Sequence, residues 1–203
     1  MRQVEELDGW RRTHYSIEVT PSLQGKEVTV FGWVRSIRRQ GGITFLVLQD
    51  KEGILQITAK RDTTPRAILQ KLDGLTLHTS IGVRGVVEAI DKAPHGAELT
   101  PKEIKVVGIA HRHPPFRLYG RRLPSIDKRL DIRALDLRRP RAQAIFRLRH
   151  HTLAAIRDFF LKNGYVEVNT PKIIASATEG GAALFPLLYY DKEAFLTQSP
   201  QLY

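Results

Sequence analysis

The sequence predicts an all-β barrel with one helix, followed by an α+β segment that begins with a long helix. Three observations predict this: strand-like alternation recurs up to about residue 109, a stretch rich in Pro and Arg follows, and a helical pattern begins near residue 140. A chain of 203 residues is long enough for two small domains, each with its own core. We therefore expect domains at 1–109 and 140–203, joined by a hinge at 110–139.

The first domain reads as three strands, one helix and two further strands. Turn signals at Gly41-Gly42 and Lys51-Glu52-Gly53 separate the first three strands, and apolar residues at helical spacing predict a helix between Pro65 and Leu72. The strands are expected at 28–34, 43–48, 54–59, 81–90 and 98–107. This order is typical of an OB-fold barrel, which commonly binds oligonucleotides on one face.

The rest of the chain predicts fewer and longer elements. Prolines between 110 and 139 work against regular structure. A helix is expected at 141–162, with an apolar arc so wide that burial on two sides is predicted. A strand at 165–168 should end before Pro171, and a strand pair at 185–196 should turn near Tyr190-Asp191-Lys192.

The net charge of +11 favours a polyanionic partner through counterion release. Between His111 and His151, twelve Arg and Lys stand against three Asp, so 12 − 3 = +9 of that charge lies in one fifth of the chain. A solvated surface that serves only solubility is the alternative. The concentration of charge in one segment favours nucleic acid.

Several classes of protein are disfavoured by composition. There is no apolar run of about 18 residues and no signal-like N-terminus, so we expect a cytoplasmic protein without membrane insertion. The chain has no cysteine, and its seven histidines show no HExxH or other ligand spacing. We therefore expect no disulfide and no structural metal.

Five motifs occur in a fixed order along the chain. They are Gly32-Trp33-Val34 with Arg38 and Gly41, Arg129-Leu130-Asp131 through Asp136-Leu137-Arg138, Asn163 to Pro171 after a long helix, Thr178-Glu179-Gly180-Gly181, and Gln198-Ser199-Pro200-Gln201-Leu202-Tyr203. Together they resemble the aspartyl branch of the class IIb aminoacyl-tRNA synthetases, in the compact archaeal and eukaryotic layout. The resemblance implies an OB-fold anticodon-binding domain at 1–109. It also implies the start of an α+β catalytic domain on an antiparallel sheet at 140–203, with 163–171 as motif 1.

The resemblance assigns anticodon contacts to five residues of the first domain. Phe45 would stack on the central uracil, while Gln56 and Glu98 would read its Watson–Crick edge. Arg38 and Arg35 would contact phosphates or anticodon bases. From pattern alone, a core position is favoured for Phe45, and ordinary surface positions are favoured for Gln56 and Glu98. The two arginines could equally be solvated charges.

Pro94 stands near the position at which the family discriminates the third anticodon base. A lysine there is typical of strict enzymes, whereas proline indicates a relaxed enzyme that charges both tRNA(Asp) and tRNA(Asn). Arg35 occupies a position where strict members carry tryptophan and relaxed members histidine. It matches neither, so it leaves the specificity open.

The resemblance also assigns roles in the second domain. Glu179 would pair with the ammonium group of aspartate, Gln201 would lie beside the bound aspartate, and Ser176 would belong to a loop that closes over it. Without the resemblance, Glu179 would read as an ordinary loop carboxylate. Motif 1, with Pro171, would form the interface of a homodimer.

The implied reaction is activation of aspartate by ATP, with Mg²⁺ neutralising the phosphates, and transfer to tRNA. Motifs 2 and 3, which carry the ATP arginines, do not occur before Tyr203. We expect the 203 residues to belong to a product about twice as long, and to bind the anticodon without forming aspartyl-adenylate.

Three alternatives remain at this stage. An asparaginyl-tRNA synthetase is the nearest, since its distinguishing pocket residues would follow Tyr203. A free-standing OB protein that binds tRNA or single strands explains the charge but not the motifs after residue 162. A synthetase paralogue that makes asparagine would generally lack the OB domain.

Overall fold

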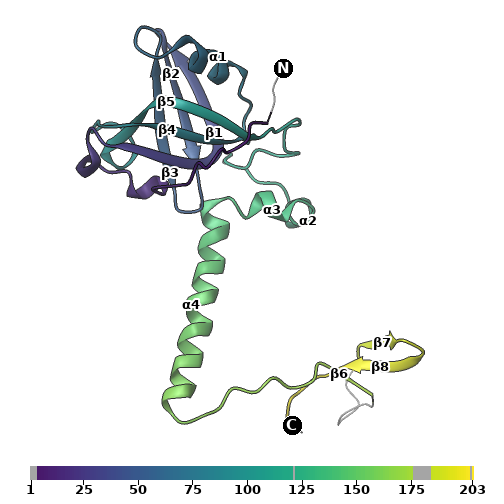
Figure 1. The fold of residues 1–203 in the computed structure, drawn as a ribbon. Helices are drawn as coiled ribbons and strands as arrows, with labels where there is room; N and C mark the ends of the chain where they lie inside the picture. The colour runs from purple at the N-terminus through teal and green to yellow at the C-terminus, as the bar shows by residue number, and fades with distance from the viewer. Residues whose placement is uncertain (1–3, 121, 176–183, 202) are drawn as a thin grey trace. The chain divides into compact units, whose positions relative to one another are not determined.

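The computed structural model describes residues 4–120, 122–175, 184–201 and 203. The chain divides into two compact units, Met1–Arg139 and Pro140–Tyr203, which are described separately (Figure 1). Residues Ser176 and Glu179, two of the expected aspartate ligands, lie outside the described residues.

The first unit is built on a closed five-stranded barrel with the strand order β1-β2-β3-β5-β4. Only β3 and β5 pair in parallel; the other four pairings are antiparallel. The elements are β1 (Glu27–Gln40), β2 (Ile43–Gln49), β3 (Ile54–Lys60), α1 (Arg66–Gly74), β4 (Ser80–Ala89) and β5 (Ala97–Gly108). The predicted OB-fold order is confirmed, with α1 between β3 and β4 at one end of the barrel (Figure 1).

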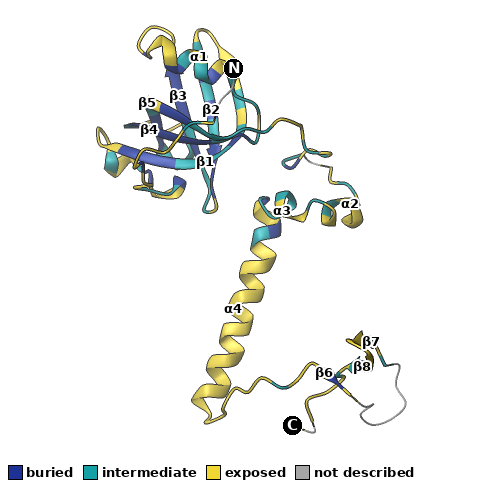
Figure 2. Ribbon diagram, turned by 45° about the vertical axis from the view of Figure 1, so that its right-hand side comes forward, coloured by how far each residue is buried: buried dark blue, intermediate teal, exposed yellow. Residues whose placement is uncertain are grey.

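Alternating side chains fill the barrel. Successive residues of a strand point to opposite faces, so every second residue enters the core. Leu46 and Leu48 of β2 and Leu55 and Ile57 of β3 are at most 1% exposed. Leu72 of α1 belongs to the same cluster, which explains why the helix closes one end. The strands accordingly form the most deeply buried part of the unit (Figure 2).

Strand β1 is longer than the expected 28–34 because it pairs with both neighbours. Its first half pairs with β4, its second half pairs with β2, and a bulge lies between Val34 and Ser36. Gly32 allows this close approach, since a Cβ there would lie 2.4 Å from the carbonyl oxygen of Gln49. A bulge and a glycine are common where a strand bends to close a barrel.

The segment before β1 packs along the barrel. Its backbone joins β5 through Glu5 N–H, which donates to Val106 O at 2.8 Å. Trp10 is 8% exposed and makes an edge-to-face contact with Phe31. Two short 3-10 helices follow, η1 (Ser16–Glu18) and η2 (Pro21–Leu23), and a third, η3 (Pro94–Gly96), lies between β4 and β5.

The segment 110–139, expected to lack regular structure, contains two short helices. These are α2 (Ile126–Leu130) and α3 (Arg133–Asp136). The prediction fails here because no proline lies between Pro124 and Pro140, so nothing prevents helical turns. Asp136 holds the segment together, with a carboxylate oxygen 2.6 Å from Arg139 Nε and the other 3.6 Å from Arg129 Nη1.

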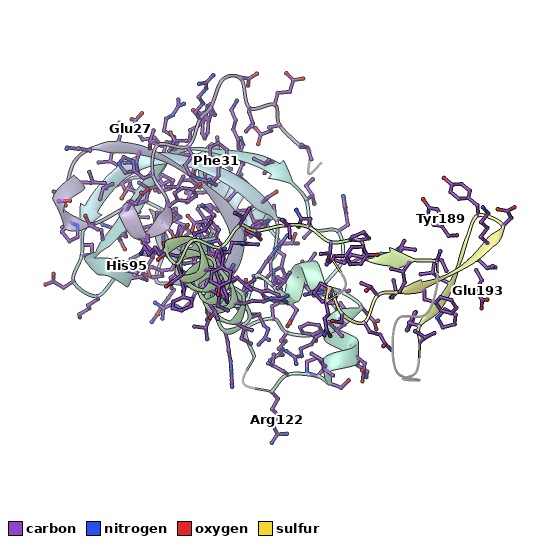
Figure 3. All side chains as sticks on the ribbon, turned by 90° about the horizontal axis from the view of Figure 1, so that it is seen from below. Glu27, Phe31, His95, Arg122, Tyr189 and Glu193 are labelled. Carbon is purple, nitrogen blue, oxygen red and sulfur yellow. The ribbon has the colours of Figure 1, made fainter. Side chains whose placement is uncertain are left out.

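The second unit contains one long helix and a small antiparallel sheet. The helix is α4 (Pro140–Lys162), and the sheet has the order β6-β8-β7, formed by β6 (Ile173–Ile174), β7 (Pro186–Tyr189) and β8 (Lys192–Leu196). The expected strand pair is confirmed, and Tyr190 at its turn has a positive φ of 57°. Tyr189 and Glu193 lie on this hairpin, with side chains that project from the ribbon (Figure 3).

Two predictions for the second unit are wrong. Residues 165–168 are not a strand, because no described strand of the unit pairs with them. Helix α4 is not buried on two sides: Ala142 is its only buried residue, and Leu148 and Phe159 are 69% and 61% exposed (Figure 2). Both elements need a partner surface that the described part of the unit does not supply.

Candidate nucleic-acid interface

Four of the five expected anticodon residues gather on strands β1, β2, β3 and β5. We call the group Arg38, Phe45, Gln56, Thr58 and Glu98 the β2–β3 face. Strand register brings it together: Phe45 lies opposite Arg38 on one side and Thr58 on the other, and Gln56 lies opposite Glu98. Phe45, Gln56, Thr58 and Glu98 each adjoin core residues along their strands, and Arg38 adjoins Ile37, which packs against the core. Their side chains therefore lie on the side of the sheet that faces away from the core.

Phe45 faces outward rather than into the core. Its neighbours Thr44 and Leu46 are buried, whereas Phe45 itself is half-buried. The guanidinium carbon of Arg38 lies 4.8 Å from the centre of the Phe45 ring, within the range of a cation–π contact. The barrel therefore presents an aromatic ring and an exposed cation side by side, as stacking platforms for bases do.

Glu98 is a buried acceptor beside this platform. It is 5% exposed, and its Oε2 accepts hydrogen bonds from Gln56 Nε2 and Thr58 Oγ1, both at 2.7 Å. Thr58 is 3% exposed, so the carboxylate is held by partners that are themselves fixed in the sheet. Sequence reasoning selected Gln56 and Glu98 but missed Thr58. Its place two residues after Gln56, on the same side of β3, was the available signal.

Pro94 begins η3 in the loop between β4 and β5. The loop is held by Ala93, which is 7% exposed and whose N–H donates to Ile90 O at 2.9 Å. Helix η3 contacts β3, the strand that carries Gln56 and Thr58. The next residue, His95, has a positive φ of 59° and an exposed side chain (Figure 3). The loop thus contacts a strand that carries two residues of the β2–β3 face.

Arg35 lies at the β1 bulge, next to the β2–β3 face rather than inside it. Its guanidinium carbon lies 4.3 Å from the ring centre of Tyr119, a residue of the 110–139 segment. The Tyr119 ring stacks on His78 at 6.1 Å between centres. Burial lowers the pKa of His78, and the nearby charges of Arg138 and His113 lower it further.

The second unit holds the remaining expected residues that the structure describes. Gln201 is exposed, and its backbone N–H donates to Ser199 Oγ at 3.1 Å. Pro171 is exposed between α4 and β6. Among the described residues, no three His, Asp or Glu side chains form a group that could hold a metal ion. In the same part of the chain, no helix is long and apolar enough to cross a membrane.

Two family models match different parts of the chain. Residues 28–107 match the OB-fold nucleic acid binding domain, and residues 125–203 match the class II tRNA synthetases of the D, K and N group. Residues 125–203 thus match the class II tRNA synthetases of this group, as the motifs in that part of the chain indicated. The second match is inconsistent with a free-standing OB protein.

The curated relatives indicate which branch of this synthetase group the chain resembles. An aspartate–tRNA(Asp/Asn) ligase of Methanocaldococcus jannaschii is 45% identical over 194 residues, which are 96% of this chain and 44% of that protein. The corresponding ligase of Methanopyrus kandleri is 46% identical over 189 residues, 93% of this chain and 44% of that protein. These relatives belong to the aspartyl branch that the motifs predicted. The chain spans less than half the length of these relatives.

Solved structures show the same fold. Asparaginyl-tRNA synthetase of Pyrococcus horikoshii, complexed with asparaginyl-adenylate, has a TM-score of 0.85 and 36% identity, over 95% of this chain and 44% of that one. A putative aspartyl-tRNA synthetase of Leishmania major Friedlin also has a TM-score of 0.85, with 27% identity, over 100% of this chain and 42% of that one. The antiparallel sheet of the second unit fits the start of a class II catalytic domain.

Proposed function

We propose that this chain forms part of an aspartate-tRNA ligase and that its β2–β3 face holds the anticodon loop. One observation carries the second proposal: Phe45 points out of the barrel between the cation of Arg38 and the hydrogen-bonded group around Glu98. A flat ring can stack a base of any identity, and the neighbouring polar groups can recognise its edge. Arg38 and Arg35 supply positive charge for the phosphates.

The enzyme would charge both tRNA(Asp) and tRNA(Asn). The relatives named above carry this double specificity in their names, and Pro94 of the present chain lies in the loop that contacts β3. Proline lacks the N–H and the charged side chain that lysine would offer to a nucleotide. It is therefore suited to accepting more than one base at the third anticodon position.

In the second unit, we propose an aspartate pocket made by Glu179, Ser176 and Gln201. A carboxylate pairs with the ammonium group of the amino acid, and an amide orients its carboxylate. The complete enzyme would use ATP and Mg²⁺ to form aspartyl-adenylate and would act in the cytoplasm, where tRNA is charged.

The protein would be a homodimer through α4 and the segment that follows it. Ile145, Leu148 and Phe159 form an exposed apolar stripe on α4, and Val166 and Val168 are 83% and 71% exposed. Apolar surface of this extent calls for a covering partner. A second copy would cover the stripe and could supply the pairing that residues 165–168 lack, with Pro171 at the interface.

Sedimentation of the chain and of an α4 double variant tests the dimer. Leu148→Glu with Phe159→Glu places two charges in the stripe and should convert a dimer to a monomer. His150→Glu, about half a turn away on the helix, is the matched control and should leave the dimer intact. A double variant that sediments like the unchanged chain would exclude this interface.

Filter binding tests the anticodon proposal. The 203-residue chain is titrated with tRNA(Asp), tRNA(Asn) and a tRNA(Asp) whose central anticodon base is changed. Phe45→Ala should weaken binding by about 1–3 kcal/mol, as loss of a stacked base does. Tyr189→Ala, which removes an exposed ring from the second unit, should not.

Each result has a distinct meaning. Equal affinity for the two natural tRNAs supports relaxed specificity, and a preference for tRNA(Asp) contradicts it. If neither Phe45→Ala nor the changed anticodon base alters the affinity, the assignment of the β2–β3 face is wrong. Only a nonspecific basic surface would then remain, recognised by its steep salt dependence.

A further inference from the structure

We infer that Thr58 and Glu98 act as positioning residues that fix the orientation of the Gln56 amide. Its carbonyl oxygen then faces the base, so it can bind only a base that presents an N–H donor. The inference rests on the proposed anticodon face and names how that face selects uracil. Glu98 is thereby assigned to orienting Gln56 rather than to reading the base itself.

The hydrogen bonds of Gln56 determine which way its amide lies. Nε2 lies 2.7 Å from Glu98 Oε2 and 3.4 Å from Thr58 Oγ1. A carboxylate only accepts hydrogen bonds, so the amide must turn its NH₂ group towards Glu98. The opposite orientation would place the carbonyl oxygen of Gln56 against a carboxylate oxygen of Glu98, and these two oxygens repel each other.

Thr58 completes the arrangement. Its hydroxyl has one hydrogen, and that hydrogen is used in the 2.7 Å bond to Glu98 Oε2. Towards Gln56 the hydroxyl therefore offers only its lone pairs, which again favour Nε2 over the carbonyl oxygen. Both neighbours thus select the same orientation, and both are nearly inaccessible to water, at 3% and 5% exposure.

The consequence is that Gln56 offers Oε1, an acceptor, to a ligand on the outer surface. Both hydrogens of its NH₂ group point at acceptors on Thr58 and Glu98. Gln56 itself is half-buried, so a ligand can reach it, and Thr58 lies directly opposite the Phe45 platform. A base stacked on Phe45 would meet this acceptor at its edge.

Uracil and cytosine differ in the group that this acceptor reads. Uracil carries an N–H donor at ring position N3, whereas cytosine carries a lone pair there. A free amide could rotate and donate its N–H to cytosine instead, so it would discriminate poorly. An amide held by Glu98 and Thr58 cannot rotate without placing two acceptors together, and such buried mismatches are costly.

The test uses the whole chain and two anticodon stem-loop RNAs, with uracil or cytosine at the central position. The measured quantity is the ratio of the two dissociation constants. Thr58→Val keeps the shape of the side chain but removes the hydroxyl, and Glu98→Gln removes the obligatory acceptor. Each should lower the preference for uracil by about tenfold. Thr58→Ser keeps the hydroxyl and should retain the preference.

A second measurement needs no RNA. In ¹⁵N-labelled chain, the two side-chain N–H signals of Gln56 should be shifted and protected from exchange, and Thr58→Val and Glu98→Gln should abolish both effects. Thermal unfolding of each variant establishes that it is folded before binding is compared.

The outcomes separate this inference from the proposed function. If the unchanged chain prefers uracil and Thr58→Val weakens both RNAs equally, the positioning role is wrong while the anticodon face stands. If the unchanged chain shows no preference, or Phe45→Ala has no effect, the anticodon face itself fails. A lower ratio in Thr58→Val that Thr58→Ser restores supports the inference.

Discussion

The guanidinium carbon of Arg138 lies 4.0 Å from the ring centre of Trp33, and the backbone carbonyl of Arg138 accepts a hydrogen bond of 2.8 Å from Gln49 Nε2. One residue near the end of the 110–139 segment is thus attached at two points to neighbouring strands of the barrel. Burial lowers the pKa of Arg138, and the nearby Tyr119 opposes that shift. The contact links the segment that leads to α4 with the strands that carry Phe45 and Arg38.

Replacing Arg138 should loosen this attachment. Arg138→Gln removes the cation over Trp33 but keeps the backbone hydrogen bond, so the free energy of unfolding of the first unit should fall by about 1 kcal/mol. Limited proteolysis should also cut the segment 110–139 faster. Arg138→Lys keeps a cation and should lose less. Equal losses in both variants would mean that packing, and not the cation, provides the stability.

Asp50 should be among the most sensitive polar positions of the barrel. Its carboxylate is 5% exposed and accepts four hydrogen bonds of 2.7–3.0 Å, from the backbone N–H and hydroxyl of Ser16 and from the N–H groups of Glu52 and Gly53. Asp50→Ala leaves buried donors unpaired and should cost about 3 kcal/mol or more in urea unfolding.

The control for Asp50 is Asp73→Asn, which removes one charge of the exposed pair between Asp73 and Arg39. Exposed pairs contribute little, so the change should stay within about 1 kcal/mol. Similar losses for the two variants would show that the hydrogen bonds of Asp50 are not what stabilises the turn between β2 and β3.

Two glycines should respond oppositely to alanine. At Gly32 a Cβ would lie 2.4 Å from a backbone oxygen of the neighbouring strand, so Gly32→Ala should destabilise the barrel by about 2 kcal/mol or more. Gly74 ends α1, and a Cβ added there would meet no atom within 4 Å, so Gly74→Ala should stabilise by about 0.4–1 kcal/mol. Thermal unfolding measures both. A neutral Gly32→Ala would show that β1 and β2 can separate without loss.

His78 should make the stability of the first unit depend on pH. Its pKa in the folded state lies below the ordinary value of 6.5, so the unfolded chain binds a proton more readily. Its contribution is therefore complete above pH 6.5 and is lost as the pH falls through 6.5 towards the folded-state pKa. Unfolding free energies at about pH 7.5 and about pH 5.5 should differ in that direction.

The variant that tests this is His78→Asn, because asparagine tolerates the positive φ of 69° at this position. It should flatten the pH dependence while keeping the backbone bond from residue 78 to Val34 O. If the slope survives in His78→Asn, another titrating group is responsible for it.

The sequence by itself determined the elements whose signals are local. Alternation with a period of two predicted the five strands of the barrel, and helical spacing predicted α1 and α4, because these periods reflect which side of a single element is covered. The turn at Tyr190 and the family motifs were likewise readable without any knowledge of packing.

Only the tertiary structure decided what distant residues do together. The local pattern favoured a core position for Phe45, and only the packing of its neighbours inside the barrel showed that its ring faces outward. Gln56 and Glu98 are 42 residues apart and meet only because β3 and β5 pair in parallel. The same pairing brings Thr58 within hydrogen-bonding distance of Glu98. Residues 165–168 have strand-like composition but form no strand, since a strand is stabilised by hydrogen bonds to a partner that its own sequence does not contain.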